Sequence, residues 1–298
     1  MDRVRIGTRG SRLAVAQARE VADALESACG VSCELVPTST RGDRRAGSLT
    51  EAGGKGLFTA ELEDALRDGR LDIAVHSAKD LPTSDAPGLC IGAVPARADA
   101  RDALVSRGGY GLADLPRSAK VGTGSLRRRA QLLAHRPDLE VVPIRGNVET
   151  RLGGTLNEDA DLDAVVVAMA GLMRCRLTRK LDNCVVPLSV EQMVPASGQG
   201  TLAVQCRRDD RRLIPMLRRI ADPSATTRLA CERAVLRGLG ADCHSCVAVH
   251  VRSGQQGWQG LAMVGGENGR AIRVEVGVPA VSDAVTVLLE KLRATPSN

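Results

Sequence analysis

The chain has 298 residues, enough for roughly two or three domains of ordinary size. Hydrophobic residues make up 43% and charged residues 26%, a balance typical of globular proteins and not of disordered or fibrous chains. The net charge is +6, and the only aromatic residues are Phe58, Tyr110 and Trp258. Because aromatic side chains for base stacking are almost absent, we expect no nucleic-acid partner and a small polyanion as the ligand.

The longest apolar run, residues 164–173, is about half the length of a bilayer-spanning helix, so no membrane partner is expected. The N-terminal stretch "MDRVRIGTRG" is charged where a signal peptide would be apolar, which favours a cytoplasmic location. The nine cysteines have no repeating spacing. In a reducing compartment we expect most of them to be free thiols.

Short apolar strands alternate with amphipathic helices, which predicts an α/β fold. "VRIGT" is a predicted strand, and Ser11 is a natural N-cap for the helix that follows it. The Gly-rich turn in "GGKGLFTAELEDAL" precedes a helix with Phe58, Leu62 and Leu66 on one face. "LDIAVHSAKDLP" is a predicted buried strand that ends in Lys79 and Asp80.

The middle of the chain repeats this pattern. "AKVGTGSLRRRAQLLA" predicts a strand, a turn and a helix that begins near Leu126. "LEVVPIRGNVETRL" predicts a strand with Arg145 and Arg151 just beyond its end, and "DAVVVAMAGLMR" a strand that delivers Arg174. After Pro223, a helix, three strands and a closing helix over residues 281–292 predict a smaller α+β domain.

Arginines recur where strands end and helices begin. In open α/β sheets ligands bind at the carboxyl ends of the strands, and helix N-termini attract anions. Arginine adds a planar fork that binds carboxylates in a bidentate manner. Solvated surface charge explains any one of these residues, but the whole set predicts a ligand with several negative groups. The set is Arg9, Arg127, Arg128, Arg145, Arg151 and Arg174.

Two short motifs keep alternatives open on residue chemistry alone. The carboxylate of Asp80 suits proton transfer or stabilisation of a developing cation, but a structural ion pair with Lys79 is the simpler interpretation. Cys243 and Cys246, in "GLGADCHSCVAV", form either half of a zinc site that His244 and His250 would have to complete, or two inert thiols. Haem attachment requires histidine directly after the second cysteine, and a thioredoxin-like pair would begin a helix. The motif meets neither requirement, because Val247 follows Cys246 and the pair precedes a predicted strand.

Nine segments together resemble the porphobilinogen deaminase (hydroxymethylbilane synthase) family, in order and spacing, over nearly the whole chain. The most specific of them are "HSAKD", "GTGSLRR" and "RGNVETR"; the others are "GTRGS", "TRGD", "GGKGLF", "DARDALVS", "AGLMR" and "SGQGTLAVQCR". The resemblance implies three domains, two similar to periplasmic binding proteins and a smaller α+β domain. Their expected boundaries are residues 1–97 with 196–216, 98–195, and 217–298.

The resemblance also implies the activity. Four porphobilinogen units are joined head to tail, with loss of ammonia, on a dipyrromethane cofactor held by a thioether to a cysteine. Cys243 matches that cysteine, and Asp80 matches the carboxylate that contacts pyrrole N–H groups and stabilises cationic, azafulvene-like intermediates. Lys79, Thr123, Ser125, Arg127 and Arg128 match positions that anchor the cofactor. Arg9, Ser11, Arg145, Arg151 and Arg174 match positions that bind substrate carboxylates, with Arg9 and Lys79 also assigned to catalysis.

The sequence departs from the family pattern at a few positions. Asp242 stands where the family has glycine and Cys246 where it has proline; Gly124, Glu51 and Met173 replace a serine, a lysine and a basic residue. A carboxylate beside Cys243 disfavours the thiolate, so Cys246 becomes a competitor for attachment. We expect no metal, a monomer, and hand-off of the product to uroporphyrinogen-III synthase. A non-catalytic anion-binding protein of the periplasmic-binding-protein fold is the alternative function.

Overall fold

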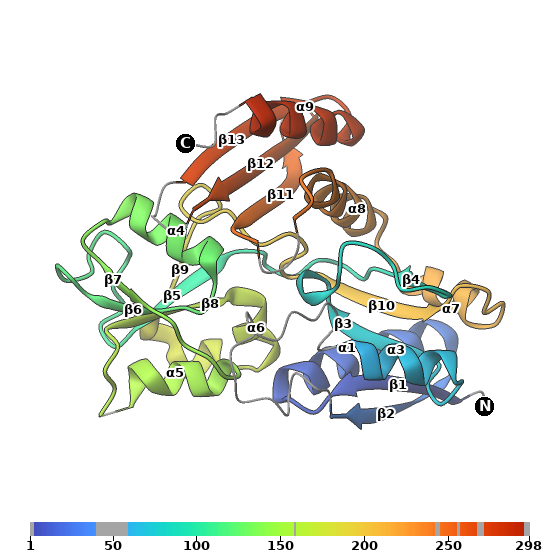
Figure 1. The fold of residues 1–298 in the computed structure, drawn as a ribbon. Coiled ribbons are helices and arrows are strands. Elements are labelled where there is room, and N and C mark those ends of the chain that lie inside the picture. Colours follow the sequence, from blue (N-terminus) through green and yellow to red (C-terminus); the bar gives the residue numbers. More distant parts are fainter. Residues whose placement is uncertain are drawn as a thin grey trace. The chain divides into compact units, whose positions relative to one another are not determined.

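A computed structural model describes residues 3–39, 59–157, 159–241, 245–254, 257–266 and 271–294 (Figure 1). Phe58 and Glu51 lie outside these ranges. The chain forms two compact units: Met1–Arg97 with Thr201–Thr226, and Ala98–Gly200 with Thr227–Asn298. Among the described residues, no helix has the length and apolar character that crossing a membrane requires.

The first unit is built on a five-stranded sheet with the order β2-β1-β3-β10-β4. The strands β1, β2 and β3 are parallel, and β10 inserts antiparallel between β3 and β4. The elements are β1 (Arg3–Arg9), α1 (Arg12–Cys29), β2 (Ser32–Thr38), α3 (Ala60–Arg67), β3 (Ile73–Ser77), the 3-10 turn η1 (Ala78–Asp80), β4 (Leu89–Ala93), β10 (Leu202–Arg207) and α7 (Leu213–Ile220).

Apolar side chains of β1, α1, β3 and β10 form the core of this unit. Ile6, Leu25, Ile73 and Val204 are essentially inaccessible to solvent. The expected N-cap is confirmed, because Ser11 Oγ accepts a hydrogen bond from Ala14 N at 3.3 Å. The predicted buried strand is β3, and it leads directly into the turn that carries Lys79 and Asp80.

The second unit contains a five-stranded sheet with the order β7-β6-β8-β5-β9 and a separate antiparallel sheet, β11-β12-β13. In the larger sheet, β6 is parallel to β7 and β8, whereas β5 runs antiparallel to β8 and β9. Its elements are β5 (Asp102–Ser106), β6 (Lys120–Gly122), α4 (Leu126–His135), β7 (Glu140–Val142), α5 (Val148–Leu156), β8 (Ala164–Ala168), α6 (Met169–Arg174), the 3-10 segment η2 (Thr178–Cys184) and β9 (Val185–Pro187).

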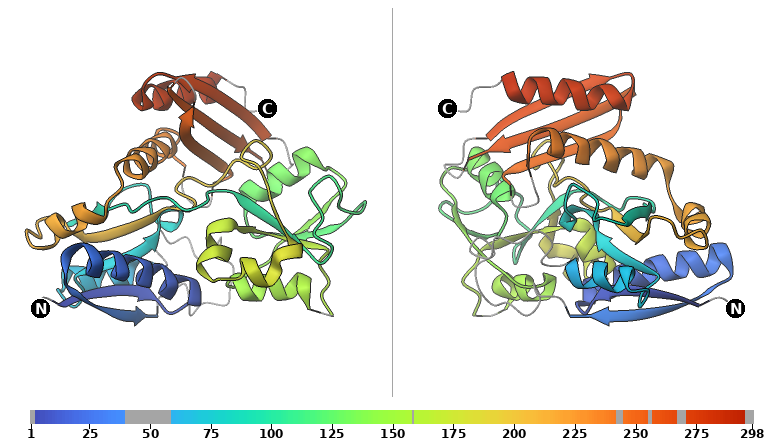
Figure 2. Two further views of the ribbon diagram at one scale, coloured as in Figure 1. Left: turned by 180° about the vertical axis from the view of Figure 1, so that it is seen from behind. Right: turned by 45° about the vertical axis from the view of Figure 1, so that its right-hand side comes forward.

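The three-stranded sheet packs against the closing helix, as Figure 2 shows from two further directions. Its strands are β11 (Val247–Gly254), β12 (Gly257–Gly265) and β13 (Ala271–Val278), and its helices are α8 (Pro223–Gly238) and α9 (Val281–Ala294). Ala284, Leu288 and Leu292 are the buried stripe of α9. The expected α/β class, with a smaller α+β part at the C-terminal end, is therefore confirmed.

Candidate active site

The carboxyl edge of the sheet in the first unit carries three of the expected site residues. Arg9 is the last residue of β1, and Lys79 and Asp80 follow the neighbouring parallel strand β3. Burial lowers the pKa of His76, on β3, to about 4; its hydrogen bond with Gln205 opposes this, and the charge of Arg9 lowers the pKa further. Arg9 therefore lies close to the end of β3. Asp80 is solvent-exposed at this edge.

The parallel strands of the second unit bring a second set of residues to one edge. The strands β6, β7 and β8 end there, and the antiparallel β5 begins there, since Asp102 pairs with Ala168. After β6, Ser125 caps α4 by accepting from Arg128 N at 3.4 Å, and Thr123 Oγ1 accepts from Ser125 N at 3.2 Å. Each hydroxyl uses its oxygen in the turn and keeps a hydrogen to donate.

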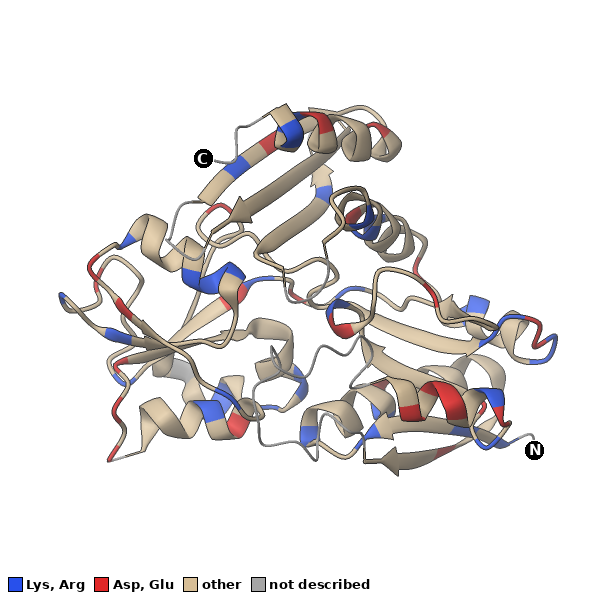
Figure 3. Cartoon of the chain, viewed as in Figure 1, with Lys and Arg blue, Asp and Glu red and all other residues tan. Residues whose placement is uncertain are grey.

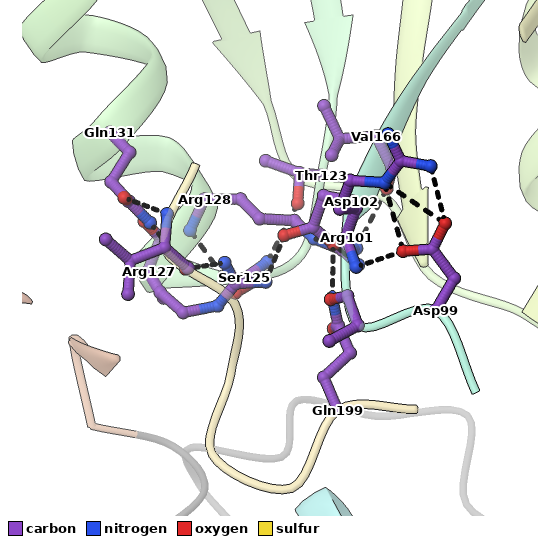
Figure 4. A network of polar contacts seen from close by, with 12 residues as sticks. Asp99, Arg101, Asp102, Thr123, Ser125, Arg127, Arg128, Gln131, Val166 and Gln199 are labelled. Carbon is purple, nitrogen blue, oxygen red and sulfur yellow. Dashed lines mark hydrogen bonds and ion pairs between the residues drawn. The ribbon is translucent and has the colours of Figure 1, made fainter. Parts of the chain in front are cut away.

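Arg127 and Arg128, in the first turn of α4, converge on the carboxylate of Asp102 (Figure 4). Arg128 donates to Asp102 Oδ1 from Nε at 3.1 Å and from Nη2 at 2.7 Å, and Arg127 Nη2 lies 2.8 Å from Oδ2. The side-chain amide of Gln199 also donates to Oδ1, at 3.0 Å. We call these four residues the Asp102 cluster.

The Asp102 cluster is buried and carries excess positive charge. Asp102 is 0% exposed, and Arg127 and Arg128 are 4% and 5% exposed. Burial lowers the pKa of Arg127, the charge of Asp102 raises it, and Arg128 lowers it further. Since an arginine stays protonated in proteins, two guanidinium groups share one carboxylate. Two guanidinium groups and one carboxylate leave this buried cluster with an excess of about one positive charge.

The guanidinium groups of Arg127 and Arg128 also have N–H donors that do not contact Asp102. Beyond Asp102, Arg127 Nη1 donates to the Val194 carbonyl at 2.6 Å, and Arg128 Nη1 to the Val166 carbonyl at 2.8 Å. These contacts occupy only part of the five N–H donors on each guanidinium. Together with the N-terminus of α4, the arrangement suits the carboxylates of a ligand.

Three further arginines belong to this unit, but two of them lie farther from strand ends than the sequence predicts. The strand β8 ends at Ala168, and Arg174 is the last residue of the helix that follows it. Arg151 lies in α5 and donates to the Gly146 carbonyl at 2.8 Å. Only Arg145, exposed between β7 and α5, is just past a strand. Figure 3 shows basic residues at the first turns of α4 and α5 and at the end of α6.

Cys243 lies outside the described residues, as do Asp242 and His244, but the segment that follows them is described. The thiol of Cys246 packs against Gly265 of β12. Burial raises the pKa of this thiol. A backbone hydrogen bond involving Gly265 and the charge of Arg127 partly oppose this rise. The flank of the "CHSC" motif is therefore close to the Asp102 cluster, and the Cys246 thiol is a poor source of thiolate.

Of the four residues in the alternative metal site, the structure describes Cys246 and His250, whereas Cys243 and His244 lie outside the described residues. His250 is buried in β11, with Nδ1 3.6 Å from Glu232 Oε1. No group of three or more potential ligands (His, Cys, Asp, Glu) that could hold a metal ion occurs among the described residues. The eight described cysteines are all free.

Residues assigned from the sequence thus fall into two sets, each on one unit. Arg9, Ser11, Lys79 and Asp80 belong to the first unit, and Thr123, Ser125, Arg127, Arg128, Arg145, Arg151 and Arg174 to the second. Sequence reasoning missed Asp102 as a site residue; it placed Gln199, like Phe58, in a segment that matches the family near the cleft but gave it no definite role. The available signal was the position of Asp102 at the start of a buried strand, where a carboxylate requires cationic partners.

Fold and site together define an α/β protein with a buried, arginine-rich cluster that carries excess positive charge. Comparison with known proteins gives the family. Residues 4–215 match the family model described as "Porphobilinogen deaminase, dipyromethane cofactor binding domain". The chain belongs to the porphobilinogen deaminase family.

Individual relatives agree along most of their length. The chain is 42% identical to porphobilinogen deaminase from Syntrophotalea carbinolica, over 95% of this chain and 89% of the relative. It is 40% identical to porphobilinogen deaminase from Streptococcus sanguinis, over 98% and 97%. Among solved structures it is similar to the methionine binding protein MetQ, at 13% identity and a TM-score of 0.47, over 78% of this chain and 96% of that one.

Proposed function

We propose that this chain is an active hydroxymethylbilane synthase, a transferase that condenses four porphobilinogen units head to tail with loss of ammonia. The single observation that best supports this, beside family membership, is the Asp102 cluster, because it combines burial, excess positive charge and N–H donors in the matched region. Family membership also favours the enzyme over a non-catalytic anion-binding protein.

The residues of the second unit fit a dipyrromethane cofactor with carboxylate side chains. Arg127 and Arg128 would bind one carboxylate through those guanidinium N–H groups that do not donate to Asp102, Val166 or Val194. Thr123 and Ser125 would donate their hydroxyl hydrogens to a second carboxylate at the N-terminus of α4. Lys79, on the first unit, is the remaining anchoring residue. Once bound, the cofactor supplies the pyrrole carbon to which the units are added.

Cys243 is the proposed attachment point. Its thiol displaces ammonia from the aminomethyl carbon of porphobilinogen, so that a C–S bond forms as the C–N bond breaks and ammonia carries away the proton. The raised pKa of the Cys246 thiol supports Cys243 over its neighbour. The closeness of that flank to Arg127 supports attachment beside the cofactor-binding residues.

Asp80 is the proposed catalytic carboxylate. Its exposed position next to a strand end leaves its oxygens accessible to a ligand, and a fixed negative charge there would stabilise the positive charge that develops on a pyrrole nitrogen as ammonia leaves. Arg9 beside it would bind a carboxylate of the incoming substrate. Ser11, Arg145, Arg151 and Arg174 would bind the side-chain carboxylates of the substrate and the growing product.

Three further features belong to the same proposal. The five-stranded and three-stranded sheets of the second unit are separate domains, which gives three domains in all. The protein acts as a monomer, and its product passes to uroporphyrinogen-III synthase.

Steady-state turnover of porphobilinogen tests the proposal. We expect the purified protein to consume porphobilinogen and release ammonia in equal amounts, with hydroxymethylbilane as product. A protein that binds porphobilinogen but never consumes it would instead be the anion-binding alternative.

A further inference from the structure

Asp102 is the centre of the buried cluster, although it lies on a different element from the residues that it contacts. It begins β5, whereas Arg127 and Arg128 are on α4 and Gln199 precedes β10. Its Oδ1 accepts from both Arg128 and Gln199, and its Oδ2 faces Arg127. Both oxygens of the carboxylate are therefore engaged, and each guanidinium is held at a defined orientation.

This geometry gives Asp102 two effects on a bound anion. It fixes the planes of the guanidinium groups, and so the directions in which their remaining N–H donors point. It also cancels one of two positive charges, so that the cluster keeps an excess of about one charge, which matches one carboxylate and not a dianion. A cluster with two uncompensated guanidinium groups would bind a compact dianion such as phosphate more strongly.

We infer that Asp102 is a positioning residue, which orients Arg127 and Arg128 toward a carboxylate of the cofactor and excludes competing dianions from the cluster. This inference rests on the proposed function, because it assigns the cluster to cofactor loading. Asp102 touches the arginines and not the reacting atoms, so its effect should appear in loading and in anion selectivity.

Asp102→Asn is the informative variant. The amide keeps the size of the side chain but removes its negative charge. Its NH2 group cannot accept a hydrogen bond, yet it would face the N–H donors of either Arg127 or Arg128. The apoprotein would be produced in a host unable to make porphobilinogen, then incubated with porphobilinogen, and loading followed by intact mass. We expect wild type to load, and Asp102→Asn to load about tenfold more slowly or worse.

The second measurement separates positioning from stability. Loading would be repeated over a range of inorganic phosphate concentrations. Because the variant cluster carries one more positive charge, half-inhibition of Asp102→Asn should require about tenfold less phosphate than that of wild type. Equal loading rates or equal phosphate sensitivity in the two proteins would overturn the inference.

Matched controls come from the same strand. Leu104 is fully buried in β5, two residues after Asp102. Leu104→Val and Leu104→Ala lower the melting temperature to different degrees without changing the charge of the cluster. Both should load normally and keep the phosphate sensitivity of wild type. If the Leu104 variant whose melting temperature matches that of Asp102→Asn loads as slowly, Asp102 has only a structural role.

A second variant keeps the test decisive if Asp102→Asn does not fold. Gln199→Leu removes one donor to Asp102 Oδ1 and leaves all three charges in place. It should slow loading while phosphate sensitivity stays at the wild-type value; wild-type loading would contradict the inference. Absence of any adduct on wild type would instead refute the proposed function.

Discussion

Asp80 is the residue on which the proposed chemistry depends most. Asp80→Asn preserves the size of the side chain but cannot balance positive charge on a pyrrole nitrogen. We therefore expect cofactor-loaded Asp80→Asn to lose about 100- to 1000-fold in turnover, the scale for loss of one preorganised electrostatic group. The measurement is porphobilinogen consumption per loaded molecule, with loading determined by mass. Near wild-type turnover would show that Asp80 has no catalytic role.

His76 makes the stability of the first unit depend on pH. Its pKa is about 4 in the folded unit against 6.5 as the reference value, so the unfolded chain binds the proton more readily between these two pH values. The free energy of unfolding should therefore fall as the pH is lowered through this window, by about 3 kcal/mol in total. Above pH 6.5 this contribution is fully present.

Urea unfolding at several pH values between 7 and 4 would measure the effect. His76→Gln serves as the comparison, because glutamine can still pair with Gln205 but does not titrate. The wild-type curve should be steeper in this pH range than that of the variant. Parallel curves would mean that His76 is protonated equally in the folded and unfolded chains.

At the scale of elements, the two sets of arginines should have separable effects. Arg127→Leu removes a guanidinium from the Asp102 cluster and leaves the carboxylate of Asp102 less well compensated, so cofactor loading should fail. Arg9 lies on the other unit, and Arg9→Leu should load normally but stall elongation. Each lost contact should cost about 2 to 5 kcal/mol of ligand binding. Intact-mass spectra that are the same for both variants would contradict this division.

The turn between β6 and α4 depends on a close approach to the next loop. A Cβ atom on Gly124 would lie 2.6 Å from the carbonyl oxygen of Ile144, the residue before Arg145. Gly124→Ala should therefore displace that loop, cost about 1 to 3 kcal/mol of stability and raise KM for porphobilinogen. Gly277→Ala is the control, since nothing lies within 4 Å of the position that its added methyl group would take. Thermal melts and kinetics of both variants would check this. Equal melting temperatures and KM values for the two variants would show that the close approach has no role.

Local signals were sufficient to predict several elements. The N-caps Ser11 and Ser125 act within three residues of themselves, and the stripe of α9 follows from helical spacing alone. Strand ends were less predictable. The apolar run after Asp163 is predicted as a single strand, but in the structure β8 ends at Ala168 and the helix α6 begins at Met169. Short apolar runs fit either structure, and packing decides between them.

Long-range pairing explains what the sequence could not predict. The strand β10 inserts between β3 and β4 from more than 100 positions along the chain, and no local pattern specifies that partner. Asp102 likewise meets Arg127 and Arg128 only because β5 runs antiparallel to β8 and so begins where β6 ends. The arginines were recognisable by type and position, but their shared carboxylate was not.

At the scale of the whole molecule, the proposed function requires that one protein carry both the arginines at its sheet edges and a covalent cofactor. The chain is basic, with a net charge of +6, and each of its two units presents cationic residues at a sheet edge. Such an arrangement suits a ligand with many carboxylates, and the family supplies that ligand as a dipyrromethane. In the proposed function, a covalent bond from the cofactor to Cys243 would join these features in one enzyme.

Intact-mass analysis of the purified wild-type protein, followed by peptide mapping, tests this central claim most directly. We predict a mass increase equal to two porphobilinogen units less two molecules of ammonia. Trypsin should release residues 238–252 as one peptide with both cysteines, so fragmentation between them is needed to assign the site. The adduct should be on Cys243, and Cys243→Ser should lack it while Cys246→Ser keeps it. An unmodified protein, or an adduct on Cys246, would contradict the account.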